Sequence, residues 1–173
     1  MQPQGFEPGP LTRFLAEDHR RLEQLLQTAL ASADYKVPAY DSFRAGLLRH
    51  IGMEEKILLP AAQRWNGGRP FLIAAKLRLD HGALAALLMP TPTTKIVATL
   101  LMILERHNLA EEGPGGWYEI CDRLAGAEVE ELVIRLRATL EPAVLPHSDT
   151  AAVFGAVHRA LERAGYTLGS DSR

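Results

Sequence analysis

Apolar residues recur at intervals of three and four along most of the chain, the spacing that places them on one side of an α-helix. The first stretch of this kind runs from about Pro10 or Leu11 to about Ala33. Its apolar side consists of Phe14, Leu15, Leu22, Leu25, Leu26 and Leu30. No stretch alternates polar and apolar residues between turn signals, so the pattern predicts an all-α fold with close to no sheet.

Proline and glycine clusters divide the pattern into four long predicted helices. These helices run from about Pro10 or Leu11 to Ala33, from Ala39 to Trp65, from Pro70 to Leu88, and from Thr93 or Thr94 to Glu112. The segments that separate or end them are Asp34–Pro38, Asn66-Gly67-Gly68, Met89-Pro90-Thr91-Pro92 and Gly113-Pro114-Gly115-Gly116. Pro60 predicts a kink within the second helix. Short turns make neighbouring helices antiparallel, so we expect an up-and-down four-helix bundle over residues 11–112.

Two further amphipathic stretches follow in residues 117–173. The apolar stripe of the first consists of Val129, Leu132, Val133, Leu136 and Leu140. The second is predicted to be capped by Asp149, to bury Val157 and Leu161 and to end at Gly165. We expect these additional helices, at about 117–166, to pack over the bundle and close its open end, so that residues 1–173 form a single domain.

Composition and charge exclude several functional classes. The chain has 173 residues, 47% of them hydrophobic, which is enough to bury a core. Its 19 basic and 21 acidic residues are spread along the chain, so no concentrated field indicates binding to nucleic acid or to a membrane. The single cysteine, Cys121, excludes an internal disulfide. Residues 1–10 contain no apolar run after a basic start, so we expect no signal peptide and a cytoplasmic protein.

One polar motif occurs twice within the predicted helices. Each copy has an Asp-His-x-x-Leu segment followed by a His-x-x-x-Glu-Glu segment, and the four segments start at Asp18, His50, Asp80 and His107. Residues four apart project from the same face of a helix, so each His-x-x-x-Glu pair delivers an imidazole and a carboxylate to one point. Two such pairs and two lone histidines supply the six ligands that a dinuclear site inside four helices requires. The predicted metal ligands are His19, His50, Glu54, His81, His107 and Glu111.

The lengths of the helices test whether the four histidines meet at one height. At about 1.5 Å per residue, His19 and His50 differ in height by only about 4–5 Å, and His50 and His81 match similarly. His81 and His107 fit less well, because their distances from the intervening turn differ by about 9 Å. Four structurally satisfied core histidines are the alternative to a metal site. The remaining histidines, His147 and His158, are predicted to lie at the surface.

In order and spacing these residues resemble the hemerythrin-like fold, the His-His-Glu cation-binding domain family, in its four-histidine bacterial type. The resemblance covers residues 11–112 and extends to the Glu-Glu-x-x-Leu-Leu-Pro sequence of residues 54–60. It implies terminal ligation by the four histidines, and bridging by Glu54 and Glu111 of two iron ions in an oxo- or hydroxo-bridged centre. The ferritin-like di-iron class is a competing hypothesis, but it uses Glu-x-x-His, and no ligand pair here has that order. Imidazole and carboxylate donors without a thiolate also favour non-haem iron over copper(I) or structural zinc.

The chain departs at two positions from the oxygen-carrying proteins of this family. Leu77 stands where those proteins carry a fifth histidine. Those proteins also place an Asp five residues after the last ligand histidine. In this chain Glu111 follows His107 by four residues and Glu112 follows it by five. About ten of twelve coordination positions would be filled, which leaves one open position on each iron and favours chemistry that uses both metals. We expect small molecules to enter through the loop at Gly115-Gly116-Trp117.

The resemblance therefore implies a non-haem di-iron protein that binds or reacts with nitric oxide, dioxygen or peroxide, in a cytoplasmic stress or iron-handling role. One alternative is a gas- or iron-sensing module that uses its C-terminal helices as an output surface. Reversible oxygen binding without turnover is a second, and a metal-free helical interaction protein is a third. The expected partners are a small diatomic molecule or peroxide, with no nucleic acid or membrane, and the C-terminal stripe is compatible with a homodimer.

Overall fold

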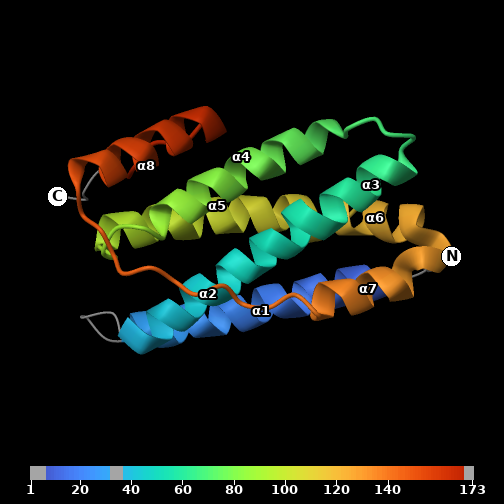
Figure 1. The fold of residues 1–173 in the computed structure, drawn as a ribbon, viewed down its shortest axis with the longest axis horizontal. Helices are drawn as coiled ribbons and strands as arrows, with labels where there is room; N and C mark the ends of the chain where they lie inside the picture. The colour runs from blue at the N-terminus through green and yellow to red at the C-terminus, as the bar shows by residue number, and fades with distance from the viewer. Residues whose placement is uncertain (1–6, 32–36, 170–173) are drawn as a thin grey trace, which may run out of the picture.

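The computed structural model describes residues 7–31 and 37–169, and this part of the chain is all-helical and contains no strand (Figure 1). The prediction of an all-α fold is confirmed. The α-helices are α1 (Pro10–Leu30), α2 (Val37–Met53), α3 (Leu59–Trp65), α4 (Leu72–Leu87), α5 (Thr94–Glu112), α6 (Trp117–Ala125), α7 (Val129–Arg137) and α8 (Ala151–Ala164). A π-helical turn, η1 (Glu54–Leu58), joins α2 to α3, and a 3₁₀ turn, η2 (Gly126–Glu128), joins α6 to α7.

The long helices run in alternating directions, with α1 packed against α2 and α4 against α5 (Figure 1). The later helices lie outside them: α8 packs along α4, while α6 and α7 both pack against α1 near the N-terminus. None of the described helices has the length and the hydropathy needed to cross a membrane.

Two apolar clusters fill the interior, and a layer of buried polar residues separates them. The cluster at one end, which we call the Phe43 cluster, includes Leu22, Leu26, Phe43, Leu47, Leu84, Leu87, Leu100 and Ile103. The cluster at the other end, which we call the Trp117 cluster, includes Leu11, Leu15, Met53, Leu58, Leu77, Trp117, Cys121 and Leu136. Along α1, α2 and α4 the buried histidine lies between residues of one cluster and residues of the other. In α5, His107 follows residues of the Phe43 cluster and precedes the start of α6, which carries Trp117. All four histidines therefore lie in one layer, including the pair that helix lengths had placed about 9 Å apart.

The second predicted helix is interrupted in a different way from the kink expected at Pro60. The wide turn η1 precedes Pro60, and the Leu59 N–H donates to the Glu54 carbonyl, five residues earlier. Proline has no N–H and its ring crowds the carbonyl four residues before it, so a local widening of the helix accommodates it. Among the described residues α2 begins at Val37, close to the expected start at about Ala39, whereas Ala33, the predicted end of the first helix, lies outside the described residues.

The last helix is capped by a different residue from the one predicted. The Thr150 hydroxyl accepts a hydrogen bond from the Val153 N–H, whereas the Asp149 carboxylate accepts two hydrogen bonds from Thr91, one from its N–H and one from its hydroxyl. Asp149 thus ties the start of α8 to the turn before α5. The predicted end at Gly165 is confirmed, because this residue has a positive φ of 83° that glycine adopts without strain.

Candidate metal centre

The structure brings the six predicted ligands together inside the helices. They come from α1 (His19), α2 (His50), η1 (Glu54), α4 (His81) and α5 (His107 and Glu111), and all six are buried. Their donor atoms form two groups within 4.8 Å, one of Glu54, His81, His107 and Glu111 and one of His19, His50 and Glu111. Such buried groups could hold a metal ion, and Glu111 belongs to both of them.

The inward-facing atoms of these residues approach one another without forming ordinary hydrogen bonds. His81 Nε2 lies 3.0 Å from Glu54 Oε2, and His107 Nε2 lies 3.1 Å from Glu111 Oε1. His81 Nε2, Glu54 Oε2 and Glu111 Oε1 are nevertheless buried atoms with no hydrogen-bond partner among the described residues. Buried polar atoms of this kind are costly unless something else satisfies them, and a bound cation would do so.

The outer nitrogen of each of the four histidines faces a carboxylate. The Nδ1 atom of His50 lies 2.9 Å from Asp18, and that of His81 lies 2.7 Å from Glu55. The Nδ1 atom of His107 lies 3.5 Å from Asp80, and that of His19 contacts Glu112. An ionised carboxylate only accepts hydrogen bonds, so each Nδ1 carries a proton, and a ring that gives up its other proton to bind a metal ion would direct its Nε2 lone pair inward.

The pair of His19 and His50 shows the consequence of this arrangement. Their Nε2 atoms lie only 2.9 Å apart. Two lone pairs at that distance repel each other unless a proton or a metal ion lies between them. Outer carboxylates that orient histidines in this way are typical of metal sites, so the residues present fit a bound metal ion.

Sequence reasoning quoted the four outer carboxylates as part of the repeat but gave them no role. Asp18 and Asp80 directly precede a histidine, yet each supports the histidine of the following helix. Glu55 and Glu112 directly follow a predicted ligand and support a lone histidine. In η1 the wide turn brings Glu54 and Glu55 to opposite ring nitrogens of His81, at 3.0 and 2.7 Å. The duplicated flanks were the signal that could have identified these carboxylates.

Sequence reasoning also missed Tyr118, because this residue lies in α6, outside both copies of the motif. Its side chain is fully buried, and its Oη lies 2.8 Å from Glu54 Oε1 and 2.9 Å from Glu111 Oε2. The same oxygen lies 3.2 Å from His19 Nε2 and 3.3 Å from His50 Nε2. The C-terminal helices therefore contribute a polar group to the centre and do more than cover it.

Charge in the centre raises the pKa of His81 and of His107. Burial lowers the pKa of His81, but its contacts with the Glu54 and Glu55 carboxylates outweigh burial and raise the pKa to about 9. Burial likewise lowers the pKa of His107, and the charge of Glu111 with the hydrogen bond to Asp80 raises it to about 10. Without metal, both imidazoles are therefore protonated at neutral pH.

We expect metal binding to release these protons. At pH 7, binding must displace at least the protons held by His81 and His107, which isothermal titration in buffers of different ionisation enthalpy measures. The folded pKa values lie above the ordinary 6.5, so the stability that these groups give the metal-free protein is complete below pH 6.5. It is lost as the pH rises through about 9 to 10. Metal affinity should rise over the same range, and binding without proton release would contradict this account.

The outer carboxylates allow a further prediction. Asp80→Asn removes the charge that orients His107, and such outer substitutions typically weaken metal binding by about 10–100-fold. Competition with a chromophoric chelator measures the affinity. Asp41→Asn is the matched control, because Asp41 pairs with Arg44 away from the centre. Equal affinities in the two variants would show that Asp80 has no such role.

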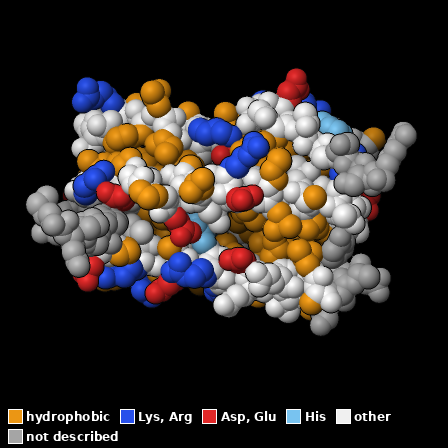
Figure 2. All heavy atoms as spheres, turned by 180° about the vertical axis from the view of Figure 1, so that it is seen from behind, with side chains coloured by type: hydrophobic (Ala, Val, Ile, Leu, Met, Phe, Trp, Pro, Cys, Tyr) orange, Lys and Arg blue, Asp and Glu red, His pale blue; other side chains and the backbone are white. Residues whose placement is uncertain are grey.

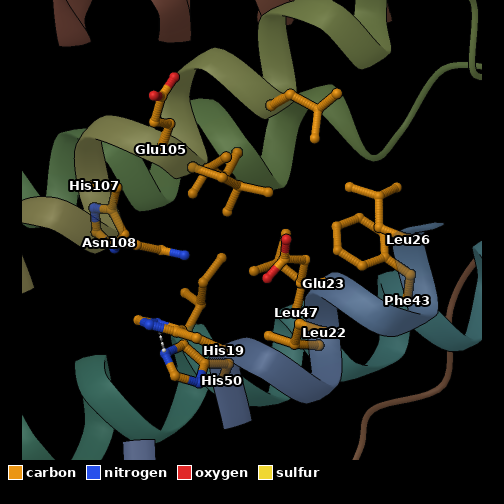
Figure 3. Close-up of a pocket in the computed structure, with 14 residues that line it drawn as sticks. His19, Leu22, Glu23, Leu26, Phe43, Leu47, His50, Glu105, His107 and Asn108 are labelled. Atoms are coloured by element: carbon orange, nitrogen blue, oxygen red, sulfur yellow. Dashed lines mark hydrogen bonds between the residues drawn. The ribbon is translucent and has the colours of Figure 1, made fainter. Parts of the chain in front are cut away.

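A cavity of about 270 Å³ adjoins the centre (Figure 3). Its walls include the centre's His19, His50 and His107, apolar side chains such as Leu47 and Leu84, and the polar residues Glu23, Glu105 and Asn108. Figure 2 shows one face of the molecule, where a histidine side chain is visible in a hollow beside an apolar area and near acidic side chains.

The predicted entry at Gly115-Gly116-Trp117 does not coincide with this cavity. Trp117 is fully buried, and a Cβ on Gly116 would lie 2.6 Å from the Glu111 carbonyl oxygen, so the chain is closely packed there. The expected end of the fourth helix is confirmed, since α5 stops at Glu112. Glu111 points into the centre, as expected, and the half-buried Glu112 lies at its edge.

In comparisons with known proteins, no family model, no curated protein and no solved structure matches this chain.

Proposed function

We propose that the chain is a hemerythrin-like di-iron protein that reacts with nitric oxide, dioxygen or peroxide. In this proposal α1, α2 with α3, α4 and α5 form the up-and-down four-helix bundle, and α6–α8 are additional helices. The observation that carries the proposal is the meeting of four histidines and two carboxylates in one buried layer, each histidine with a carboxylate on its outer nitrogen. The geometry of the donors and the duplicated motif support it together.

The donor set favours iron. The six residues offer imidazole nitrogens and carboxylate oxygens, and the only cysteine, Cys121, belongs to neither group of donors. Nitrogen and oxygen donors without a thiolate suit non-haem iron. His81 and His107 with Glu54 would hold one ion, His19 and His50 the other, and Glu111 would serve both. When bound, two iron(II) ions would supply two electrons and become iron(III). With two protons from solvent, these electrons reduce peroxide to two waters, or two molecules of nitric oxide to nitrous oxide and one water.

The residues around the cavity select what reaches the centre. Apolar walls favour small neutral molecules over ions, because an ion would lose far more hydration free energy there, and the exposed carboxylates of Glu23 and Glu105 repel anions. The Asn108 side chain extends toward the cavity, and its Oδ1 has no hydrogen-bond partner among the described atoms (Figure 3). In this proposal the Asn108 amide nitrogen, which points toward the cavity, donates a hydrogen bond to an incoming peroxide and orients it beside His107.

Reactivity of the reduced protein tests the proposal. Iron-loaded protein, reduced without oxygen, is mixed with nitric oxide or with hydrogen peroxide, and nitrous oxide formation and peroxide consumption are followed. We expect at least one of these reactions to be much faster than in the iron-free protein. Reversible oxygen uptake without consumption of either molecule would instead identify a carrier. The absence of a histidine at Leu77, which is buried in the Trp117 cluster, favours the reactive alternative.

Narrowing the cavity should slow the reaction without removing the metal. Leu47 lines the cavity one helical turn before His50, and Leu47→Trp would fill part of the space. We expect the second-order rate constant for peroxide to fall by about tenfold or more, about 1.4 kcal/mol in activation free energy, while iron content is unchanged. Leu140→Trp is the control, because Leu140 is exposed and does not line the cavity. An unchanged rate in Leu47→Trp would show that molecules arrive by another route.

A further inference from the structure

The two groups of donors in the centre are unequal. Glu54, His81, His107 and Glu111 provide four donor residues, whereas His19, His50 and Glu111 provide only three. One oxygen atom lies close to every member of the smaller group. Tyr118 Oη is 3.2 Å from His19 Nε2, 3.3 Å from His50 Nε2 and 2.9 Å from Glu111 Oε2.

We propose that Tyr118 is a metal ligand, and that its phenolate oxygen completes the group of His19, His50 and Glu111. This inference rests on the proposed metal centre and goes beyond it, because Tyr118 lies outside both copies of the repeated motif. On binding, the phenol O–H bond is replaced by an oxygen–metal bond and the proton is released to solvent. Each of the two groups then has four donor residues.

The hydrogen bonds around Tyr118 support a role as a ligand. Four polar atoms surround the hydroxyl, namely carboxylate oxygens of Glu54 and Glu111 and the Nε2 atoms of His19 and His50. A phenol has one proton and can donate to only one of them. If the phenol donates to one carboxylate, the other carboxylate faces a lone pair of the phenol oxygen in a fully buried space, which is unfavourable unless a cation is present.

The local fold holds Tyr118 at this position. After α5 the chain turns back through Gly113–Gly116, where the Gly116 N–H donates to the Gly113 carbonyl at 2.7 Å. A Cβ on Gly116 would lie 2.6 Å from the Glu111 carbonyl oxygen, so a larger residue cannot take this place without a shift of the backbone. The preceding Trp117 is fully buried and packs edge to face on Phe71, with ring centroids 5.3 Å apart. These contacts fix the chain directly before Tyr118, which lies seven residues after Glu111.

A tyrosine bound to iron(III) has a spectroscopic signature that a merely hydrogen-bonded tyrosine lacks. We compare three iron-loaded, oxidised proteins: the parent, Tyr118→Phe, and the matched control Tyr166→Phe. Tyr166 is also a buried tyrosine, but its hydroxyl contacts Lys76 and not the centre. The readouts are iron per chain, visible absorption, and resonance Raman spectra excited in the visible band. We expect a tyrosinate-to-iron(III) charge-transfer band with tyrosine ring modes in the parent and in Tyr166→Phe, and its loss in Tyr118→Phe.

The outcomes separate this inference from the proposed function. If the parent binds two irons but shows no tyrosinate modes, or if Tyr118→Phe keeps them, Tyr118 is not a ligand although the metal centre stands. If the parent binds no iron after reconstitution, both proposals are overturned. Should Tyr118→Phe fail to fold, ring-deuterated tyrosine in the parent decides the question. Isotope shifts of the enhanced modes together with their persistence in Tyr166→Phe would support Tyr118, and unshifted modes would overturn its assignment.

Discussion

Replacing Glu111 with glutamine is expected to remove both metal ions from the protein. Glu111 is the one described residue that belongs to both groups of candidate donors, and it is fully buried. Glutamine keeps the shape of the side chain but replaces the charged carboxylate with a neutral amide, a much weaker ligand for a metal cation. Metal analysis of the reconstituted variant should therefore show a loss at both groups, while a substitution of His50 should affect mainly one.

The neighbouring residue provides the control for Glu111. Glu112→Gln removes a carboxylate that contacts the outer nitrogen of His19 and lies partly at the surface. This variant should retain both ions with weaker binding. If Glu111→Gln retained one tightly bound ion, the two groups would be independent of each other. If Glu112→Gln lost both ions, the position of the shared carboxylate would have been wrongly assigned.

The second large effect concerns stability. Trp117 is a fully buried side chain in the Trp117 cluster, so Trp117→Ala should lower the free energy of unfolding by about 3–5 kcal/mol. Denaturant unfolding of the metal-free protein measures this loss separately from metal binding. Trp65→Ala is the matched control, because Trp65 is only partly buried at the edge of the same cluster and should lose clearly less. Equal losses would mean that α6 is not a part of the core.

The stability of α6 bears directly on the centre, because this helix carries Tyr118 next to Trp117. The periodicity of apolar residues predicted two helices after residue 117, with stripes that begin at Val129 and near Val157, and their packing over the others. It did not predict a separate helix at residues 117–125. It could not predict that a polar side chain from α6 reaches the histidines, because a lone tyrosine in an apolar stripe is typical of any core. The position of Tyr118 depends on contacts of α6 with α1, α2 and η1, which are distant from it in the sequence.

The six candidate ligands could be predicted from the sequence because the spacing of four residues fixes a common helical face. Their heights were predicted less well, since the estimate gave every residue between His81 and His107 the rise of a helix. In the structure, residues 88–93 between α4 and α5 are not α-helical, and the two rings lie 4.8 Å apart between their centroids. Non-helical residues advance along the chain by more than 1.5 Å each, which removes the expected mismatch of about 9 Å.

The π-helical turn was beyond prediction for a similar reason. Pro60 indicated an irregularity in the second helix, but a proline is compatible with a kink, a break or a widened turn. In the structure the turn contains both Glu54 and Glu55, which contact the two nitrogens of His81. The position of the widening is thus fixed by packing and by the centre together, and the sequence contains no separate signal for it.

Metal content after anaerobic reconstitution with iron(II) is the most direct test of the account. The protein is freed of excess iron, and iron per folded chain is measured at neutral pH and again after acidification. The account predicts two irons per chain at neutral pH, one for each group of donors, and their release when the histidines are protonated in acid. A single iron, or none, in a chain that is shown to be folded would contradict the dinuclear centre.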